Sequence, residues 1–305
     1  MVSGTLSRKP RASRFCATVP ATCSKSLSRS RGGKCMAWSI MHRVMVAGHA
    51  EVHRVEGAVR FSSCFAEAPL VLRPLARRDP ALLYVGQLGG GYVTGDEYEL
   101  SLAVRAGASL TVLGQASAKV YPGERGVRVR VRGHVEAGGC LALLGEPLVP
   151  YAESSYEGQI RIALEAGASA LVWESFTAGR LARGERWQLA ALRNAVECER
   201  DGRVVARDAI RLTAADASEG CGPANAFATL LIGGPRFEPW LDDLARRVRR
   251  SSLTSVDRRG DLLLARFGVT EPGQLAQLRA DTAEWLLAHA GHQAGQDLLR
   301  AAGSR

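Results

Sequence analysis

The stretch "LEAGASALVWESFTAGR", residues 164–180, combines the two features on which the interpretation of this sequence depends. The run 170–173 is apolar and typical of a buried β-strand, and Glu174 places a carboxylate directly after it. An unpaired charge in an apolar interior is costly, so this carboxylate needs a physical explanation. The phrase "AGAS" before the run also occurs at residues 106–109, and a variant, "AGGC", stands at 137–140.

These phrases mark three copies of one sequence unit. The copies are "VRAGASLTVLGQ" (104–115), "VEAGGCLALLGE" (135–146) and "LEAGASALVWES" (164–175), offset by 31 and then 29 residues. Each follows a stretch of alternating polarity, which is the period-2 signature of a strand, and glycine is free to take positive φ in the turn. The unit predicts strand, tight turn, strand, at a spacing found in stacked repeat architectures. Three weak copies favour layered β-sheets over a regular solenoid.

Further elements extend this pattern on both sides. Turn pairs at 56–57 and 201–202 stand between alternating runs and predict hairpins. Helical periodicity appears late, from Glu238 and again after Pro272. We therefore predict a mainly β protein with layered or stacked, antiparallel-rich β-sheets, strand-turn-strand repeats and two helices near the C-terminus.

The charge of the chain is concentrated in one segment. The 305 residues have a formal net charge of +10, and residues 1–50 contain nine Lys and Arg but no Asp or Glu, so residues 51–305 are close to neutral. We expect 1–50 to be a disordered, basic, Ser- and Arg-rich extension: an organelle transit peptide, a basic leader, or upstream sequence wrongly joined. Residues 51–305 then form a single β domain, cytoplasmic unless the extension directs it to an organelle.

Composition argues against several classes of function. No apolar run approaches the ~18 residues of a membrane span, so no membrane partner is expected. The near-neutral body has no basic stripe interleaved with aromatic residues, which argues against nucleic acid. The seven cysteines lack C-x-x-C spacing, so a zinc ribbon is not predicted. His289 and His292 could form a metal pair, but a surface pair is the simpler interpretation.

The glycine-rich segment 86–96, "GQLGGGYVTGD", invites a nucleotide-binding interpretation. Gly90 and Gly95 have P-loop spacing, but Asp96 follows where a lysine should neutralise phosphate. A backbone bend between packed strands is therefore the better prediction. Lys119 is expected either on the surface or paired with a carboxylate such as Asp96 or Glu174.

The segment 174–187 gathers arginines around Glu185 and ends in a tryptophan. It is either a solvated loop or a charged contact surface, since Arg and Trp are enriched at interfaces. The candidates for a partner surface here and on the first late helix are Arg183, Arg186, Trp187, Arg246 and Arg249.

Four motifs in a fixed order resemble one family. "GGGYVTGD", "GQASAKVY", "EPLVPYAESSY" and "VWESFTAGRLARGERW" are similar to motifs of the urease accessory protein family UreD, also called UreH. The resemblance covers roughly residues 52–290, with Gly145 where the family usually has Pro and Leu113-Gly114 where a Thr pair is common. The matching positions are Gly90, Gly91, Gly95, Asp96, Ala116, Lys119, Tyr121, Pro147, Pro150, Tyr151, Trp173, Glu174, Gly179, Arg180, Gly184 and Glu185.

The resemblance implies a non-enzymatic scaffold with a layered β-fold. UreD-like proteins hold a UreF-like helical protein, which docks a UreG-like GTPase carrying nickel, and the assembly engages apo-urease. Nickel would be in transit, with no stably bound metal or cofactor, and GTP would belong to the UreG-like partner. Two other classes stay open from the residues themselves: a β-rich enzyme that uses carboxylates, and a nucleic-acid-binding protein.

A nickel path would give Glu174 a role. Nickel accepts carboxylate ligands, and a path needs polar groups that lower the cost of desolvation without holding the ion tightly. The candidates for such a path are Asp96, Glu99, Glu146 and Glu174. The alternative is that Glu174 pairs with Arg180 or Lys119 and holds two β-layers together.

Overall fold

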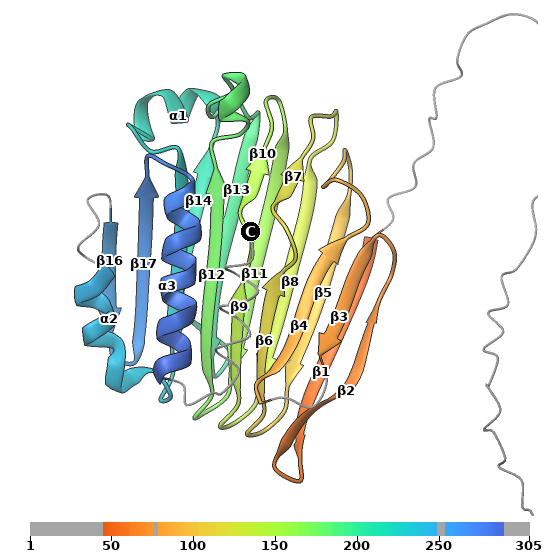
Figure 1. Ribbon diagram of the computed structural model, residues 1–305, viewed down its shortest axis with the longest axis vertical. Helices are drawn as coiled ribbons and strands as arrows, with labels where there is room; N and C mark the ends of the chain where they lie inside the picture. Colours follow the sequence, from red (N-terminus) through yellow and green to blue (C-terminus); the bar gives the residue numbers. More distant parts are fainter. Residues whose placement is uncertain (1–44, 76–78, 249–253, 290–305) are drawn as a thin grey trace, which may run out of the picture. The chain divides into compact units, whose positions relative to one another are not determined.

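The computed structural model describes residues 45–75, 79–248 and 254–289, which form two β-sheets packed face to face, with helices beside one of them (Figure 1). Sheet A consists of β1 (Met45–Val55), β2 (Ala58–Ala66), β5 (Glu97–Val104), β8 (Val127–Val135), β11 (Ser155–Leu164), β13 (Ala191–Arg200) and β14 (Arg203–Leu212). Sheet B consists of β3 (Leu70–Leu75), β4 (Ala81–Gln87), β6 (Ser109–Gly114), β9 (Cys140–Leu144), β12 (Ser169–Thr177), β15 (Ala226–Gly233), β16 (Thr254–Arg259) and β17 (Leu262–Val269), extended by the short β7 (Ala118–Val120) and β10 (Leu148–Pro150).

The helices come late in the chain, and the predicted mainly β class is confirmed. Within the described residues they are α1 (Ala214–Gly220), α2 (Leu241–Val248) and α3 (Gly273–His289). The two predicted late helices correspond to α2 and α3. The short α1 is not among the predicted elements, and a capping box formed by the Thr213 side chain and Asp216 begins it.

Each sequence repeat places one strand in each sheet. β5, β8 and β11 lie in sheet A, and the Ala-Gly turns carry the chain across to β6, β9 and β12 in sheet B. The glycines of these turns, Gly107, Gly138 and Gly167, all have positive φ. Consecutive copies pair in register, with Val104 opposite Val135 in sheet A. The turn in each repeat therefore connects a strand of sheet A to a strand of sheet B. The sequence pattern by itself is equally compatible with a hairpin within one sheet.

The prediction of antiparallel-rich sheets is wrong for the centre of both sheets. β5, β8, β11 and β13 pair in parallel in sheet A, and β4, β6, β9 and β12 pair in parallel in sheet B. The reason is that successive copies of the repeat return to the same sheet in the same direction. Antiparallel pairs lie toward the edges, where the predicted turns at 56–57 and 201–202 join β1 to β2 and β13 to β14.

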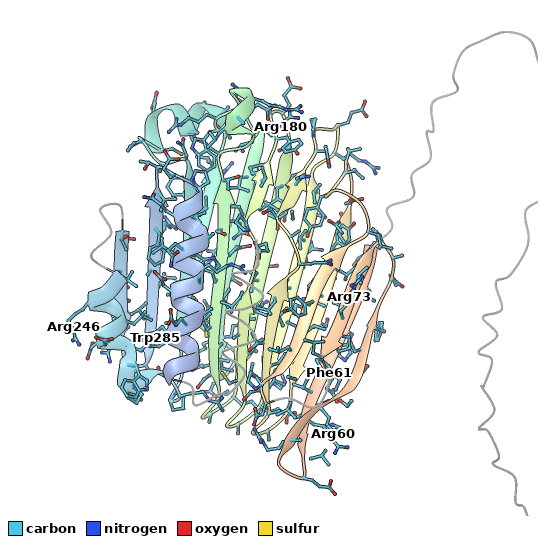
Figure 2. The ribbon with its side chains drawn as sticks, in the orientation of Figure 1. Arg60, Phe61, Arg73, Arg180, Arg246 and Trp285 are labelled. Atoms are coloured by element: carbon cyan, nitrogen blue, oxygen red, sulfur yellow. The ribbon has the colours of Figure 1, made fainter. Side chains whose placement is uncertain are left out.

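The sequence patterns of the two sheets follow from what covers their faces. Sheet A has one face on the core and one open face, so β5 alternates strictly between buried and partly exposed residues. Sheet B is covered on both sides, by sheet A and by α2 and α3, so all five residues of β9 are buried. Trp285 of α3 packs into the core on the helix side of sheet B, near Phe237 (Figure 2).

The predicted boundary at residue 50 is wrong, because residues 45–50 already belong to β1. β1 pairs with β2 on one side and β5 on the other, and Val46 and Ala50 are buried. The first half of β1 contains small residues such as Gly48 and Ala50, so its sequence lacks the strong alternation of polar and apolar residues that predicts a strand. The expectation of a disordered extension over residues 1–44 lies outside the described residues.

Candidate functional site

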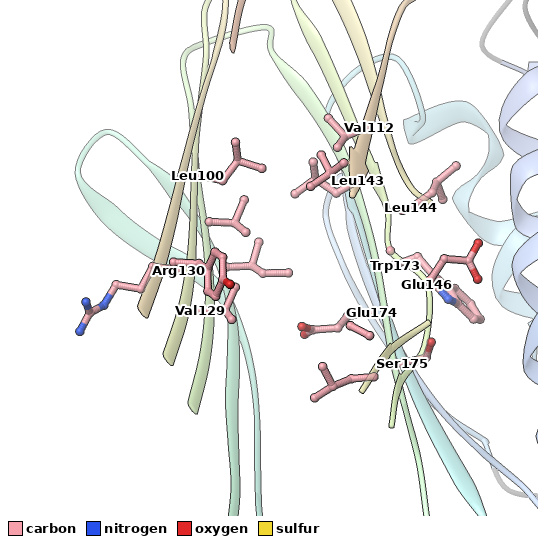
Figure 3. Close-up of a pocket in the computed structure, with 18 of the residues that line it drawn as sticks. Leu100, Val112, Val129, Arg130, Leu143, Leu144, Glu146, Trp173, Glu174 and Ser175 are labelled. Carbon is pink, nitrogen blue, oxygen red and sulfur yellow. The ribbon is translucent and has the colours of Figure 1, made fainter. Parts of the chain in front are cut away.

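Glu174 points into the space between the two sheets. Along β12 the side chains alternate, so Val172 contributes to the core between the sheets and Trp173 to the core on the helix side. Glu174 therefore shares the inward face with Val172. Figure 3 shows its carboxylate directed toward sheet A, away from Trp173.

A cavity of about 210 Å³ surrounds this carboxylate. Its lining is mainly apolar and comes from both sheets, with Leu100 and Val129 on one side and Val112 and Leu143 on the other (Figure 3). Three tyrosines, Tyr92, Tyr98 and Tyr156, complete it. The cavity is thus an apolar chamber into which Glu174 brings a carboxylate.

A second cavity of about 280 Å³ shares part of this lining and includes the glycine-rich segment. Tyr92, Ala116 and Ala118 border both cavities, and exposed Gly89 and Lys119 lie at the second one. The two cavities therefore lie next to each other, one bordered by Glu174 and the other by the exposed glycine-rich loop.

The environment of Glu174 disfavours its charged form. Burial raises the pKa of Glu174 to about 7, the hydrogen bond donated by Asn194 Nδ2 opposes the rise, and the Asp208 charge adds to it. This carboxyl group therefore changes charge near neutral pH, which is where a weakly held cation can compete with a proton.

The tyrosines form one aromatic group beside the carboxylate. The Tyr92 ring lies 5.1 Å from that of Tyr98 and 6.4 Å from that of Tyr156, between centroids. Burial raises the pKa of Tyr98 to about 12 and raises those of Tyr92 and Tyr156 as well. Neutral hydroxyl groups therefore offer oxygen atoms near Glu174 without adding charge.

Asp96 does not line the cavity itself but contacts one of the tyrosines that do. Its Oδ2 atom accepts hydrogen bonds from the backbone N–H of Val93 at 2.9 Å and from the Tyr98 hydroxyl at 3.4 Å. It closes the turn that ends the glycine-rich loop, and it reaches the cavity through Tyr98.

Glu99 and Glu146 do not point into the cavity. Glu99 is on the outer face of sheet A, where Arg132 Nη1 lies 3.0 Å from its carboxylate. Glu146 borders the cavity beside Gly145, but its carboxylate is bound by Arg279 of α3 and points to the helix side of sheet B (Figure 3). Of the four predicted carboxylates, Glu174 points into the chamber, Glu146 borders it but points away, and Asp96 contacts the lining residue Tyr98.

The alternative of an ion pair to Glu174 is wrong. Arg180 pairs with Glu185 and stacks over the Tyr151 ring at 4.1 Å. Lys119 has an exposed side chain, as expected for a surface lysine. The partner of Glu174 is neutral Asn194, because β13 faces β12 across the interior.

The glycines and prolines of the motifs shape the chain around these hollows. Gly91 has φ +142°, and a Cβ there would lie 2.3 Å from the carbonyl oxygen of Lys119, so no other residue fits. This confirms a bend between packed strands in place of a phosphate loop. Gly90, Gly95, Tyr121, Pro147, Pro150, Gly179 and Gly184 lie in the neighbouring turns and short strands at the same end of the sheets.

The predicted partner surface is only partly exposed. Trp187 is 2 % exposed, donates its indole N–H to the Ala224 carbonyl and stacks on Phe227, so its assignment to a surface is wrong. Arg186 binds the nearby Asn225 side chain at 2.7 Å. Arg183 and Arg246 are exposed, and Figure 2 shows Arg246 directed outward from α2; Arg249 lies outside the described residues.

Sequence reasoning missed the polar neighbours of Glu174. Asn194 stands at a buried position of the alternating strand "ALRNAVECER". A polar residue at an inward position of such a strand is the feature by which the sequence could have indicated this neighbour. Tyr92 and Tyr156 belong to the quoted motifs but had no assigned role. Their proximity depends on the packing of the two sheets.

Two findings concern metals and membranes. Over residues 45–75, 79–248 and 254–289, no group of three or more His, Cys, Asp or Glu side chains is arranged to hold a metal ion. No helix in the described part of the chain has the length and hydropathy needed to cross a bilayer.

Fold and site together define a two-sheet β protein in which Glu174 brings a carboxylate into an apolar chamber between the sheets. Residues 46–300 match the UreD urease accessory protein family. The chain therefore belongs to the UreD family of urease accessory proteins, as the motif resemblance indicated.

Individual relatives agree with this membership. Urease accessory protein UreD of Sorangium cellulosum is 38% identical over 193 residues, covering 62% of each chain, so the match spans less than two thirds of that relative. UreD of Anaeromyxobacter sp. is 34% identical over 215 residues, 67% of this chain and 71% of the relative. UreD of Mesorhizobium japonicum is 30% identical over 232 residues, 73% and 82%.

Proposed function

We propose that this protein is a non-enzymatic scaffold of urease maturation through which nickel passes into apo-urease. It would assemble in the cytoplasm with a UreF-like protein and a UreG-like GTPase that supplies the nickel and binds the GTP. Nickel is cargo in this proposal, and the chain has no resident metal or cofactor. Family membership supports the accessory role.

The observation that carries the nickel step is the inward carboxylate of Glu174. A cation in a purely apolar chamber would lose its hydration without compensation. One carboxylate with neutral tyrosine hydroxyls near it lowers that cost, while a complete ligand cage would trap the ion. The adjoining cavity, which includes exposed residues of the glycine-rich loop, supports entry of the ion from this side.

A matched pair of carboxylate variants tests the proposal. Glu174→Gln keeps the shape of the side chain and removes its charge inside the chamber, whereas Glu99→Gln removes a charge on the outer face of sheet A. Each variant is co-expressed with the partner proteins and urease, and the nickel content and activity of urease are measured along with complex assembly.

We expect Glu174→Gln to lower nickel delivery at least about 10-fold, since loss of even an outer-shell partner of a metal ligand typically costs that much, with assembly intact. Glu99→Gln should deliver nickel normally. Normal nickel content with Glu174→Gln, in an intact complex and also when combined with Asp96→Ala, would overturn the proposed path.

A further inference from the structure

Asn194 is an unusual residue for its position. It lies on β13 with 7 % of its surface exposed, and its Nδ2 donates a hydrogen bond to Glu174 across the space between the sheets. An ionised carboxylate only accepts hydrogen bonds, so the amide nitrogen faces Glu174 when this group is charged. Its Oδ1 atom is consequently buried without a hydrogen-bond partner among the described residues.

Stability alone does not explain this arrangement. A buried acceptor without a partner is costly, and replacing both partners of a buried hydrogen bond by apolar groups of the same shape can be nearly neutral or stabilising. A leucine has a similar size and would suit the surrounding apolar layer. The amide is therefore retained for what it does to Glu174.

Gly158 makes the room that Asn194 needs. It is the cross-strand partner of Asn194 in the β11–β13 pair, and a Cβ at Gly158 would lie 2.1 Å from Asn194 Oδ1. Gly158 does not have a positive φ angle, so alanine could adopt its backbone conformation. The glycine is required here for space, and the space holds the Asn194 side chain.

We propose that Asn194 is a positioning residue for the cation path: it holds the Glu174 carboxylate toward the chamber, and Gly158 permits it to do so. This inference rests on the proposed function of Glu174. The amide N–H supplies a dipole that stabilises the negative carboxylate without adding the positive charge that Lys or Arg would bring. A positively charged partner would repel the passing cation, and an apolar one would leave the carboxylate without support.

A double-mutant cycle tests this assignment in the co-expressed complex. The variants are Glu174→Gln, Asn194→Leu and their combination, and the readouts are nickel per urease site, nickel affinity measured by competition with a chromophoric chelator, and thermal unfolding. If Asn194 acts through Glu174, Asn194→Leu lowers delivery and affinity about 10-fold, as loss of the support of a metal ligand does. The combination then loses no more than Glu174→Gln alone.

Two glycine-to-alanine variants distinguish a positioning role of Asn194 from a general effect on the packing between the sheets. Gly158→Ala would meet Asn194 Oδ1 first, at 2.1 Å, and the Tyr156 ring at 2.7 Å. Gly133→Ala, one strand away on β8, would meet only the ends of Leu141 and Ile162, at 2.7 and 2.8 Å. Both variants crowd the space between the sheets. We expect similar losses of thermal stability, but a loss of nickel delivery per folded complex only for Gly158→Ala.

The outcomes distinguish this inference from the proposed function. If Glu174→Gln has no effect, the path through Glu174 fails and the role of Asn194 fails with it. If Glu174→Gln lowers delivery but Asn194→Leu does not, only the positioning role is wrong. Additive losses in the double variant, or equal losses of delivery in the two alanine variants, would also overturn it.

Discussion

At the scale of the residue, three glutamates show how the environment decides the role of one side chain. Glu99 lies in an ion pair on the open face of sheet A, Glu146 is bound by Arg279 beneath α3, and Glu174 faces the chamber with a neutral partner. Burial raises the pKa of the Glu174 carboxyl group to about 7. Arginines pair with Glu99 and Glu146, so Glu174 is the glutamate of this set whose carboxyl group faces the chamber with an uncharged partner.

This raised pKa predicts a pH dependence of stability. The pKa of Glu174 is about 7 in the folded protein against a usual 4.5, so between these values the folded state binds more protons than the unfolded one. Stability then falls as the pH rises from 4.5 through 7, by about 3 kcal/mol at most. Glu174→Gln should remove this part of the slope, which denaturant unfolding at pH 5 and pH 8 measures; identical slopes in both proteins would contradict it.

At the scale of the element, α3 is attached to sheet B by polar and apolar contacts together. Arg279 binds the Glu146 carboxylate and lies 3.3 Å from the Leu144 carbonyl oxygen, at the end of β9. Trp285, about two turns further along the helix, packs near Phe237. The helix thereby covers the outer face of sheet B behind the chamber.

This attachment predicts a structural role for Glu146. Glu146→Gln leaves the Arg279 charge, 17 % exposed, without its carboxylate, and it should lower the free energy of unfolding by about 1–3 kcal/mol, less than for a fully buried pair. Nickel delivery per folded complex should be unchanged. A loss of nickel delivery with unaltered stability would instead return Glu146 to the cation path. The variant Arg279→Leu serves as the matched control, since it breaks the same pair from the helix side.

At the scale of the whole molecule, the two-sheet body depends on a strand that begins earlier than composition suggests. β1 connects β2 to β5, and its first half contains Val46 and Ala50 in the buried layer. The basic segment before it holds nearly all the excess positive charge of the chain. The described fold therefore begins at residue 45, directly after the segment that holds most of the charge excess.

Two truncations test this boundary. Removal of residues 1–44 keeps every described strand and should leave thermal unfolding unchanged, while any salt-sensitive binding to nucleic acid should disappear with the basic segment. Removal of residues 1–50 also deletes half of β1 and exposes the edge of β5, so it should lower the unfolding temperature or prevent folding. Equal unfolding temperatures for both truncations would contradict the assignment of β1.

The sequence by itself determined the local structure and the family. Alternation and the Ala-Gly turns predicted the strands, the late apolar stripes predicted α2 and α3, and Gly91 and its neighbours predicted a bend. These features depend on residues close in the chain, which is why they could be found without a structure. The motif order was sufficient to indicate the UreD family.

Only the tertiary structure decided which strands pair and which face each carboxylate occupies. A strand-turn-strand unit can close a hairpin or cross between sheets, and the choice made the central strands parallel. Burial of Trp187 and the meeting of Glu174 with Asn194 and Gly158 both follow from the packing of segments far apart in the chain. The sequence singled out Glu174, but the chamber around it exists because two sheets enclose it.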